Sequence, residues 1–274
     1  MDLSLIKNKL AASQSKNVKR EKIDYSLIFF KPKPGKYQIR ILPSKFDKSN
    51  PFREIYFHYG FSKGPILALT NWNEKDPIAE FAKNLRKSAD KEDWQLAKKI
   101  EPKLRYFVPV LVRGEEAQGT RLWEFGKLVY EQLLGIAADE DYGDFTDITD
   151  GRDFTIEAVE DVVAGRKGIK CNIRVKPKTS AISEDAAIVT KALEEQPDIL
   201  GINKHYSFDE LKDLLDKWLN PDSEEDTETP IASKTEDEED DFLAEMQKPV
   251  EQTYKLDTKA AKTSASDKFD DLFS

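Results

Sequence analysis

Three short segments of this chain combine aromatic rings with lysine or arginine side chains. They are residues 91–99, 103–107 and 121–127. A single strand of nucleic acid offers phosphates and flat base faces, which cations and aromatic rings can bind without reading sequence. Each ring alone is more often a core residue than a stacking platform, so the prediction depends on the grouping of rings with cations. The pattern indicates a groove for a single-stranded polyanion.

Charge is distributed unevenly along the chain. Residues 1–130 hold 26 Lys and Arg against 15 Asp and Glu, a balance of +11. Residues 131–220 hold 11 against 20 (−9), and residues 221–274 hold 6 against 17 (−11). A basic N-terminal part with an acidic tail is typical of a protein that binds a polyanion and regulates that binding with its own acidic segment.

Motifs that carry catalysis are missing. The sequence has no phosphate loop, no glycine-rich dinucleotide turn, no His-Glu-x-x-His and no nucleophile elbow. One dense acidic group could serve a metal-dependent nuclease, although its spacing is more typical of a solvated turn: Asp144, Asp147, Asp150 and Asp153. We therefore expect a protein that is not an enzyme.

Cysteine and histidine are scarce. Cys171 is the single cysteine, which excludes an intrachain disulfide, and with His58 and His205 it cannot complete a four-ligand zinc site without carboxylates. No apolar run approaches the roughly 20 residues of a membrane helix, and residues 1–7 lack the features of a secretory signal. We expect a soluble protein of a reducing compartment, with no metal and no membrane partner.

Periodicity predicts the elements that must position the basic and aromatic segments. Strands are expected at residues 26–30, 35–42, 53–61, 65–69, 104–112 and 121–125, with a hairpin joining 147–163 to 169–175. Helices are expected within 77–100 and at 126–138, 184–195 and 207–219, the last opened by a capping sequence, Ser207-Phe208-Asp209-Glu210. Short strands interrupted by helices favour a mainly β fold, a small barrel, over a parallel α/β sheet.

Three regions follow from composition. Residues 1–22 form a basic arm, which could equally be a solvated helix; residues 23–220 form the core, with a helical subdomain at about 71–100; residues 221–274 form an acidic tail. Residues 223–241 are nearly free of apolar side chains and cannot repay the entropy of ordering, so a disordered tail is expected. Two apolar islands interrupt the tail, at residues 242–246 and 267–274.

Several segments, taken in their order and spacing, resemble the single-stranded-DNA-binding proteins of T-even phages, also called helix-destabilising proteins. The match spans about residues 27–175 and then the acidic tail. It rests on Ile39-Arg40-Ile41-Leu42-Pro43-Ser44-Lys45, Pro51-Phe52, Tyr59-Gly60-Phe61, Lys91-Glu92, Trp94, Lys98-Lys99, Tyr106-Phe107 with Val110-Leu111-Val112, and Phe125-Gly126-Lys127.

This resemblance implies a fold and a set of partners. The core would be an OB-fold-like barrel with a groove for single-stranded DNA. The N-terminal arm would make cooperative contacts between neighbours along DNA, and the acidic C-terminal region would recruit replication, recombination and repair proteins.

The resemblance also implies site residues. Carried over by position, the groove residues are Trp94, Lys98, Lys99, Tyr106, Phe107 and Trp123. Charge and location add Arg40, Lys45, Lys103, Arg105 and Lys127. The cooperativity arm would use Lys7, Lys9, Lys16, Lys19 and Arg20. The end of the tail would be a docking peptide for partners, or else a merely solubilising segment: Asp267, Phe269, Asp270, Asp271, Leu272 and Phe273.

The sequence departs from the family at its zinc site. The best-known members bind zinc through one histidine and three cysteines. Here residues 69–81 contain no cysteine, and Tyr59 rather than His58 precedes Gly60. We expect a zinc-free subdomain held by apolar packing of residues such as Trp72 and Phe81.

The expected function is sequence-nonspecific coating and protection of single-stranded DNA during phage DNA replication, recombination and repair, in the cytoplasm of an infected bacterium. The acidic tail would compete for the groove when DNA is absent. An RNA-binding translational regulator on the same fold is the main alternative, followed by the nuclease. An interaction protein is third, because it does not explain the basic N-terminal part.

Overall fold

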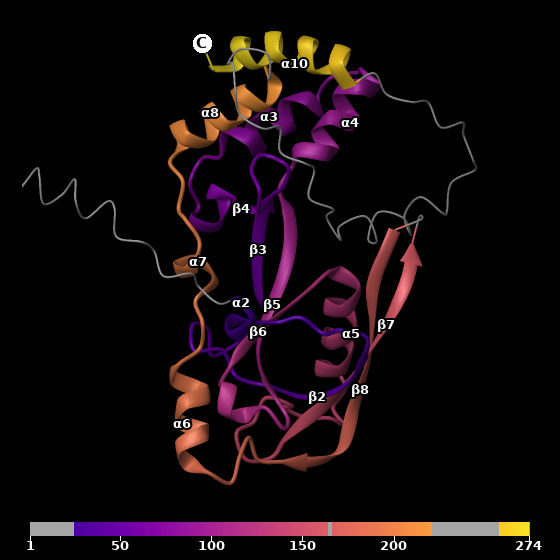
Figure 1. The fold of residues 1–274 in the computed structure, drawn as a ribbon, viewed down its shortest axis with the longest axis vertical. Coiled ribbons are helices and arrows are strands. Elements are labelled where there is room, and N and C mark those ends of the chain that lie inside the picture. Colours follow the sequence, from indigo (N-terminus) through magenta and orange to yellow (C-terminus); the bar gives the residue numbers. More distant parts are fainter. Residues whose placement is uncertain (1–24, 164–165, 221–257, 274) are drawn as a thin grey trace, which may run out of the picture.

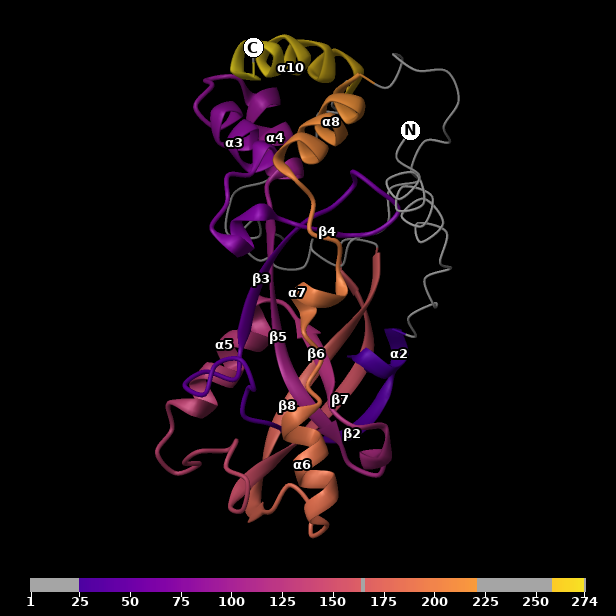
Figure 2. The same cartoon turned by 90° about the vertical axis from the view of Figure 1, so that its left-hand side faces the viewer.

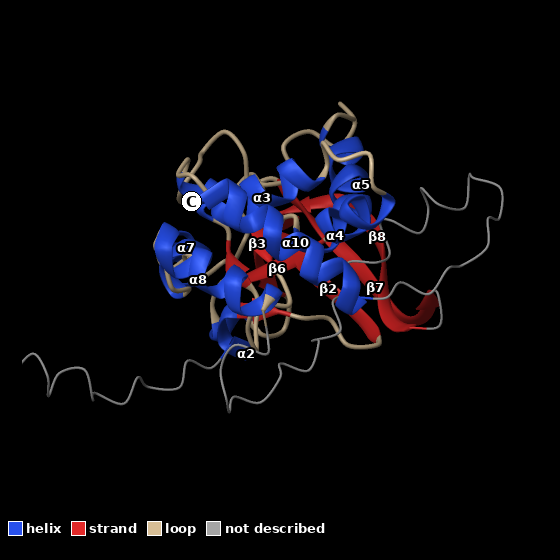
Figure 3. Ribbon diagram, turned by 90° about the horizontal axis from the view of Figure 1, so that it is seen from above, coloured by secondary structure: helices blue, strands red, loops and turns tan. Residues whose placement is uncertain are grey.

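The computed structural model describes residues 25–163, 166–220 and 258–273. A twisted sheet forms the body of the molecule, and a layer of helices lies beyond one end of it (Figures 1 and 2). That layer consists of α3 (Pro77–Leu85), α4 (Lys91–Ile100), α8 (Phe208–Leu219) and α10 (Thr258–Phe273). Seen from above, the helices of this layer cover the ends of the strands (Figure 3).

Eight strands form one mixed sheet in the order β1-β6-β5-β2-β7-β8, with β3 pairing β5 and β4. The strands are β1 (Phe29–Phe30), β2 (Gly35–Ile41), β3 (Arg53–His58), β4 (Ile66–Leu67), β5 (Lys103–Val112), β6 (Arg121–Phe125), β7 (Gly151–Val163) and β8 (Arg166–Ser180). Only the β1–β6 pairing among them is parallel. Within the described residues β1 and β8 are the two ends of this order and do not pair with each other. The sheet is therefore open, and the OB-fold-like barrel is not confirmed.

Strand β5 lies at the centre of this arrangement and pairs with β2, β3 and β6. Its second half, from Tyr106 onward, is buried throughout. Val108, Val110 and Val112 pack with Ile39 and Ile41 of β2 in one core cluster. The run at 104–112 is strongly apolar because a strand that is buried on both faces carries apolar side chains at successive positions and not at alternate ones.

Local signals define the helices. Asp76 caps α3, accepting from the Ala79 N–H at 3.0 Å, and Pro77 occupies the first turn. A capping box at Ser207 and Glu210 opens α8, as its sequence predicts. The expected helices at 126–138 and 184–195 are confirmed as α5 (Lys127–Ala137) and α6 (Ala186–Glu194).

Three elements differ from expectation. The segment expected as a strand at 26–30 begins as helix α2 (Tyr25–Ile28), and the short helix α7 (Ile199–Ile202) was not predicted. The end of the acidic tail, expected to be disordered, forms helix α10. Ala265 and Phe269 of α10 are buried against the helical layer, so contacts from distant elements order what composition alone would not.

No described helix combines the length and the apolar character that crossing a membrane requires.

Candidate nucleic-acid interface

A cleft of about 220 Å³ lies between the β5–β6 part of the sheet, helix α5 and strand β8. We call it the β6–α5 cleft. Its aromatic and basic lining residues are Phe30, Lys31, Arg105, Trp123, Phe125 and Lys170.

Aromatic rings form the floor of this cleft. Phe30 of β1 is paired in parallel register with Trp123 of β6, and the Trp123 ring lies 4.8 Å from the Phe125 ring. These three side chains are only 4%, 1% and 6% exposed. They are fixed by core packing, so they offer an apolar floor in a defined position rather than freely moving platforms.

Cationic side chains outnumber acidic ones on the lining. Lys31 and Lys170 are exposed, whereas the Arg105 side chain is only 11% exposed and its Nε lies 3.5 Å from Glu124 Oε1. Three cations thus share the lining with one carboxylate, Glu124. The cleft therefore combines an excess of positive charge with an apolar floor, which suits a phosphate backbone carrying bases.

Two residues expected in the groove line this cleft, and a third, Lys127, is next to a lining residue in the sequence. Arg105 and Trp123 line it directly. Lys127 follows the lining residue Gly126, which is the N-cap of α5, and it is exposed with its Nζ 3.6 Å from Glu131 Oε1. An exposed pair of this kind contributes little to stability, so Lys127 can exchange Glu131 for a phosphate at small cost.

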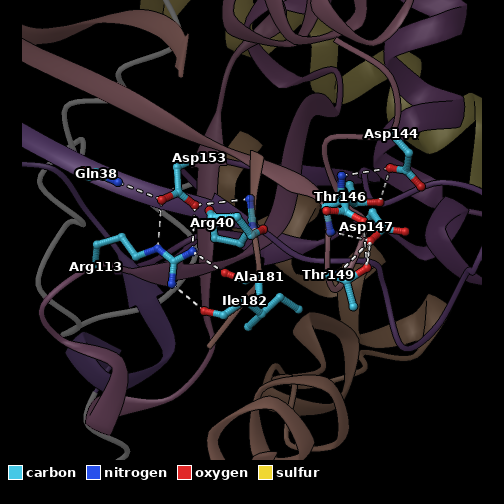
Figure 4. Close-up of polar contacts among 12 residues, drawn as sticks. Gln38, Arg40, Arg113, Asp144, Thr146, Asp147, Thr149, Asp153, Ala181 and Ile182 are labelled. Atoms are coloured by element: carbon cyan, nitrogen blue, oxygen red, sulfur yellow. Dashed lines mark hydrogen bonds and ion pairs between the residues drawn. The ribbon is translucent and has the colours of Figure 1, made fainter. Parts of the chain in front are cut away.

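Arg40 was expected in the groove, but its side chain is fully buried. Its Nη1 lies 3.3 Å from Asp153 Oδ1, and its Nη2 donates to the Ser180 carbonyl oxygen. Figure 4 shows Arg40 and Arg113 on the same Asp153 carboxylate. Burial lowers the pKa of Arg40, and Asp153 opposes that shift. Arg40 is enclosed by protein, so we leave it out of the proposed surface.

Two aromatic residues expected in the groove also lie in the core. Tyr106 is stacked on Tyr130 with ring centroids 3.9 Å apart. Phe107 is 1% exposed and packs against Phe57, whose ring centroid is 5.9 Å away. Neither residue lines the β6–α5 cleft, so we leave both out as well.

The remaining groove candidates gather elsewhere. Trp94 on α4 is 46% exposed, with the Arg86 guanidinium 4.5 Å and the Lys98 Nζ 5.9 Å from its ring centre. Lys99 lies over the Trp218 ring at 5.6 Å, and Lys103 donates to the Lys98 carbonyl oxygen at 2.9 Å. Helix α4 belongs to the layer beyond the sheet, away from α5 (Figure 1). These residues form a second basic and aromatic group.

Lys45 joins neither group. Its side chain is exposed and its Nζ donates to the Glu194 carbonyl oxygen at 2.8 Å, at the end of α6. Lys45 therefore provides a hydrogen-bond donor for a carbonyl group at the C-terminal end of that helix.

Among the aromatic and basic lining residues, the sequence prediction missed Phe30, Lys31 and Lys170, and it included Phe125 only as part of the segment 121–127. The signal was present, because Phe29-Phe30-Lys31 is an aromatic–cation cluster and Lys170 lies in an alternating basic strand. It also missed a second, more open cleft of about 390 Å³, where Phe46 and Tyr56 are exposed and Arg53 lies 4.7 Å from the Phe46 ring centre.

In the acidic group at 144–153, Asp144 and Asp147 stabilise turns. Asp144 Oδ1 accepts from the Thr146 N–H and hydroxyl at 2.8 and 2.6 Å, and Asp147 Oδ1 accepts from the N–H groups of Thr149 and Asp150 (Figure 4). Hydrogen bonds from Asp150 and Thr149 lower the pKa of Asp147. Asp153 instead forms ion pairs with Arg40 and Arg113.

The arm residues Lys7, Lys9, Lys16, Lys19 and Arg20 lie outside the described residues. At the other end, Phe269 is buried and Phe273 half-buried in the helical layer, while Asp270, Asp271 and Leu272 are exposed. The side chain of Asp267 lies outside the described part.

The residues near the family's zinc position do not suit zinc. His58 Nε2 lies 2.9 Å from Asp76 Oδ2, and both side chains are fully enclosed. Asp76 also accepts from the Leu69 N–H at 2.8 Å and caps α3. Among the described residues no three His, Cys, Asp or Glu side chains form a possible metal site. A tetrahedral set of nitrogen and sulfur ligands is not offered here.

Comparison with protein families gives one match. The family model described as "gp32 DNA binding protein like" matches residues 33–220. These residues include the whole β6–α5 cleft except Phe30, Lys31 and Pro32. A search of curated proteins gave no match.

Proposed function

The chain belongs to the gp32-like DNA-binding protein family, and from that premise we propose that it binds single-stranded DNA without sequence preference in the β6–α5 cleft. The observation that most supports this proposal is the excess of cations around a fixed aromatic floor. A single strand fits such a surface because its base faces and its phosphates are both accessible, whereas the base faces of a duplex are stacked inside the helix.

Different lining residues would contact the phosphates and the bases. Lys31, Arg105 and Lys170 would contact phosphates, and the counterions released would make affinity fall steeply with salt. Bases would rest on the apolar floor, where contact is equally available to all four. Trp94 with Lys98 and Lys99 on α4 would give the strand a second point of attachment. None of these contacts reads a base edge, so the proposed binding is nonspecific.

The family and the charge distribution support a wider role. We propose that the protein coats and protects single-stranded DNA during phage DNA replication, recombination and repair in an infected bacterium. The acidic C-terminal region, which balances at −11 over residues 221–274, would recruit the replication and recombination proteins.

We expect the Lys31→Ala/Lys170→Ala variant to bind oligo(dT) more weakly and with a weaker salt dependence. Losing two phosphate contacts should reduce the slope of log affinity against log salt by about 1.4, at about 0.7 per contact on a single strand. Fluorescence anisotropy of labelled oligo(dT) over a series of salt concentrations measures both quantities. The Lys48→Ala/Lys63→Ala variant, which loses two exposed lysines outside the cleft, is the matched control.

An unchanged slope in the cleft variant would exclude this cleft as the binding site. Equal affinity for duplex DNA would contradict selective binding of single strands. Tighter binding of oligo(U) than of oligo(dT) would favour the RNA-binding alternative.

A further inference from the structure

The C-terminal helix α10 packs across the other helices of the layer beyond the sheet (Figures 1 and 3). Ala265, Phe269 and Phe273 are spaced four residues apart and so lie on one face of α10. Ala265 is fully buried and Phe269 is 4% exposed, with its ring 5.9 Å from that of Phe81 on α3. We call the receiving surface, formed by α3, α4 and α8, the α10 groove.

Polar contacts fix the register of α10 in this groove. Lys268 Nζ forms an ion pair with the carboxylate of Asp93 on α4, a side chain that is only 4% exposed. Lys212 Nζ on α8 donates to the Phe273 carbonyl oxygen at 3.1 Å and lies 5.3 Å from the Phe273 ring centre. A short helix with an aromatic pair and a lysine at these positions is therefore what the groove recognises.

The covalent connection does not restrict α10 to its own groove. Residues 220–257, 38 in all, join α8 to α10. A chain of this length spans at most about 130 Å. The groove of an adjacent molecule therefore lies within reach, and every contact described above is available there unchanged, because a second copy has the same groove and the same helix.

We propose that on single-stranded DNA the α10 groove of one molecule binds α10 of the neighbouring copy. This inference rests on the proposed function, since DNA is what holds the copies side by side. The two surfaces involved are different, so the contact is head-to-tail. Repeated between neighbours that DNA holds in a row, it gives an open linear chain, which is the form a coated strand requires. Adjacent attachment raises the effective concentration of the neighbour's helix toward that of the molecule's own.

Carbodiimide crosslinking of the ion pair between Lys268 and Asp93 tests the proposal. The reagent activates the carboxylate, the lysine amine displaces it to form an amide, and a urea leaves. Equal amounts of ¹⁴N-labelled and ¹⁵N-labelled full-length protein are mixed, with and without long oligo(dT), crosslinked and digested. Mass spectrometry of the linked Asp93–Lys268 peptide then shows whether its two halves come from one molecule or from two.

The expected result is a light–heavy linked peptide on oligo(dT) and only light–light and heavy–heavy peptides without it. The Lys268→Ala variant should lose all three species, which verifies the assignment. Anisotropy of the same mixture reports DNA binding independently. If the protein binds DNA and the light–heavy species does not form, the exchange of α10 is wrong and the proposed function stands. If the protein does not bind oligo(dT), both fail.

Discussion

Replacing Asp153 with alanine should lower the free energy of unfolding by about 3–5 kcal/mol, the cost of leaving a buried charge without its partner. Asp153 accepts from Arg113 Nη2 at 2.8 Å, from Arg113 Nε at 3.0 Å and from Gln38 Nε2 at 2.7 Å, and it faces Arg40. Arg40 is fully buried and Asp153 is 6% exposed. Loss of the carboxylate would therefore leave the buried Arg40 guanidinium with its hydrogen bonds to Ser180 but without its ion-pair partner.

Urea denaturation followed by circular dichroism measures this loss. The matched control is Asp144→Ala, which removes an exposed carboxylate from the nearby turn and should cost only about 1 kcal/mol, the value of a typical hydrogen bond. Equal effects of the two substitutions would show that the Asp153 network contributes no more than a surface turn.

Replacing Asp76 with alanine should have a comparable effect on the helical layer, about 3–5 kcal/mol for a broken buried pair. The carboxylate bonds His58, the Leu69 N–H and the Ala79 N–H together, so three separate segments lose a partner at once. The matched control is Asp90→Ala at the N-cap of α4, where one exposed hydrogen bond from the Glu92 N–H is lost and about 1 kcal/mol is expected.

The same carboxylate gives the layer an acid dependence. Burial tends to raise the pKa of Asp76, but its bonds to His58 and to backbone N–H groups outweigh burial and lower the pKa. A depressed pKa in the folded state contributes stability above the unfolded value of about 3.9, and that stability is lost as pH falls through the folded pKa. Below about pH 4 the free energy of unfolding should therefore fall less steeply with decreasing pH in Asp76→Asn than in the parent protein. Identical pH dependence of the two proteins would contradict this assignment.

Local signals in the sequence were sufficient for much of the fold. The cap at Ser207 and the apolar spacing at 126–138 predicted α8 and α5, and the alternation in 169–175 predicted the hairpin of β7 and β8. These features depend on residues close together in the chain, so periodicity and capping chemistry reveal them.

Contacts between distant residues explain what could not be predicted. Charge and location indicated Arg40 as a groove residue, but Asp153, 113 positions away, pairs with it inside the protein. Phe269 and Phe273 were identified as a docking peptide, yet their groove is built by α3, α4 and α8. The cleft itself brings together Lys31, Arg105 and Lys170 from three strands or their ends, which no local pattern indicates.

The most direct test of the β6–α5 cleft is photocrosslinking of oligo(dT) carrying 5-iodouracil, followed by mass mapping of the crosslinked peptides. We predict crosslinks in residues 30–32, 123–129 and 169–171, which line the cleft on three sides. These crosslinks should weaken in the Lys31→Ala/Lys170→Ala variant and persist in the Lys48→Ala/Lys63→Ala control. Crosslinks confined to α4, or to the open cleft around Phe46 and Tyr56, would contradict the account and move the DNA to that surface.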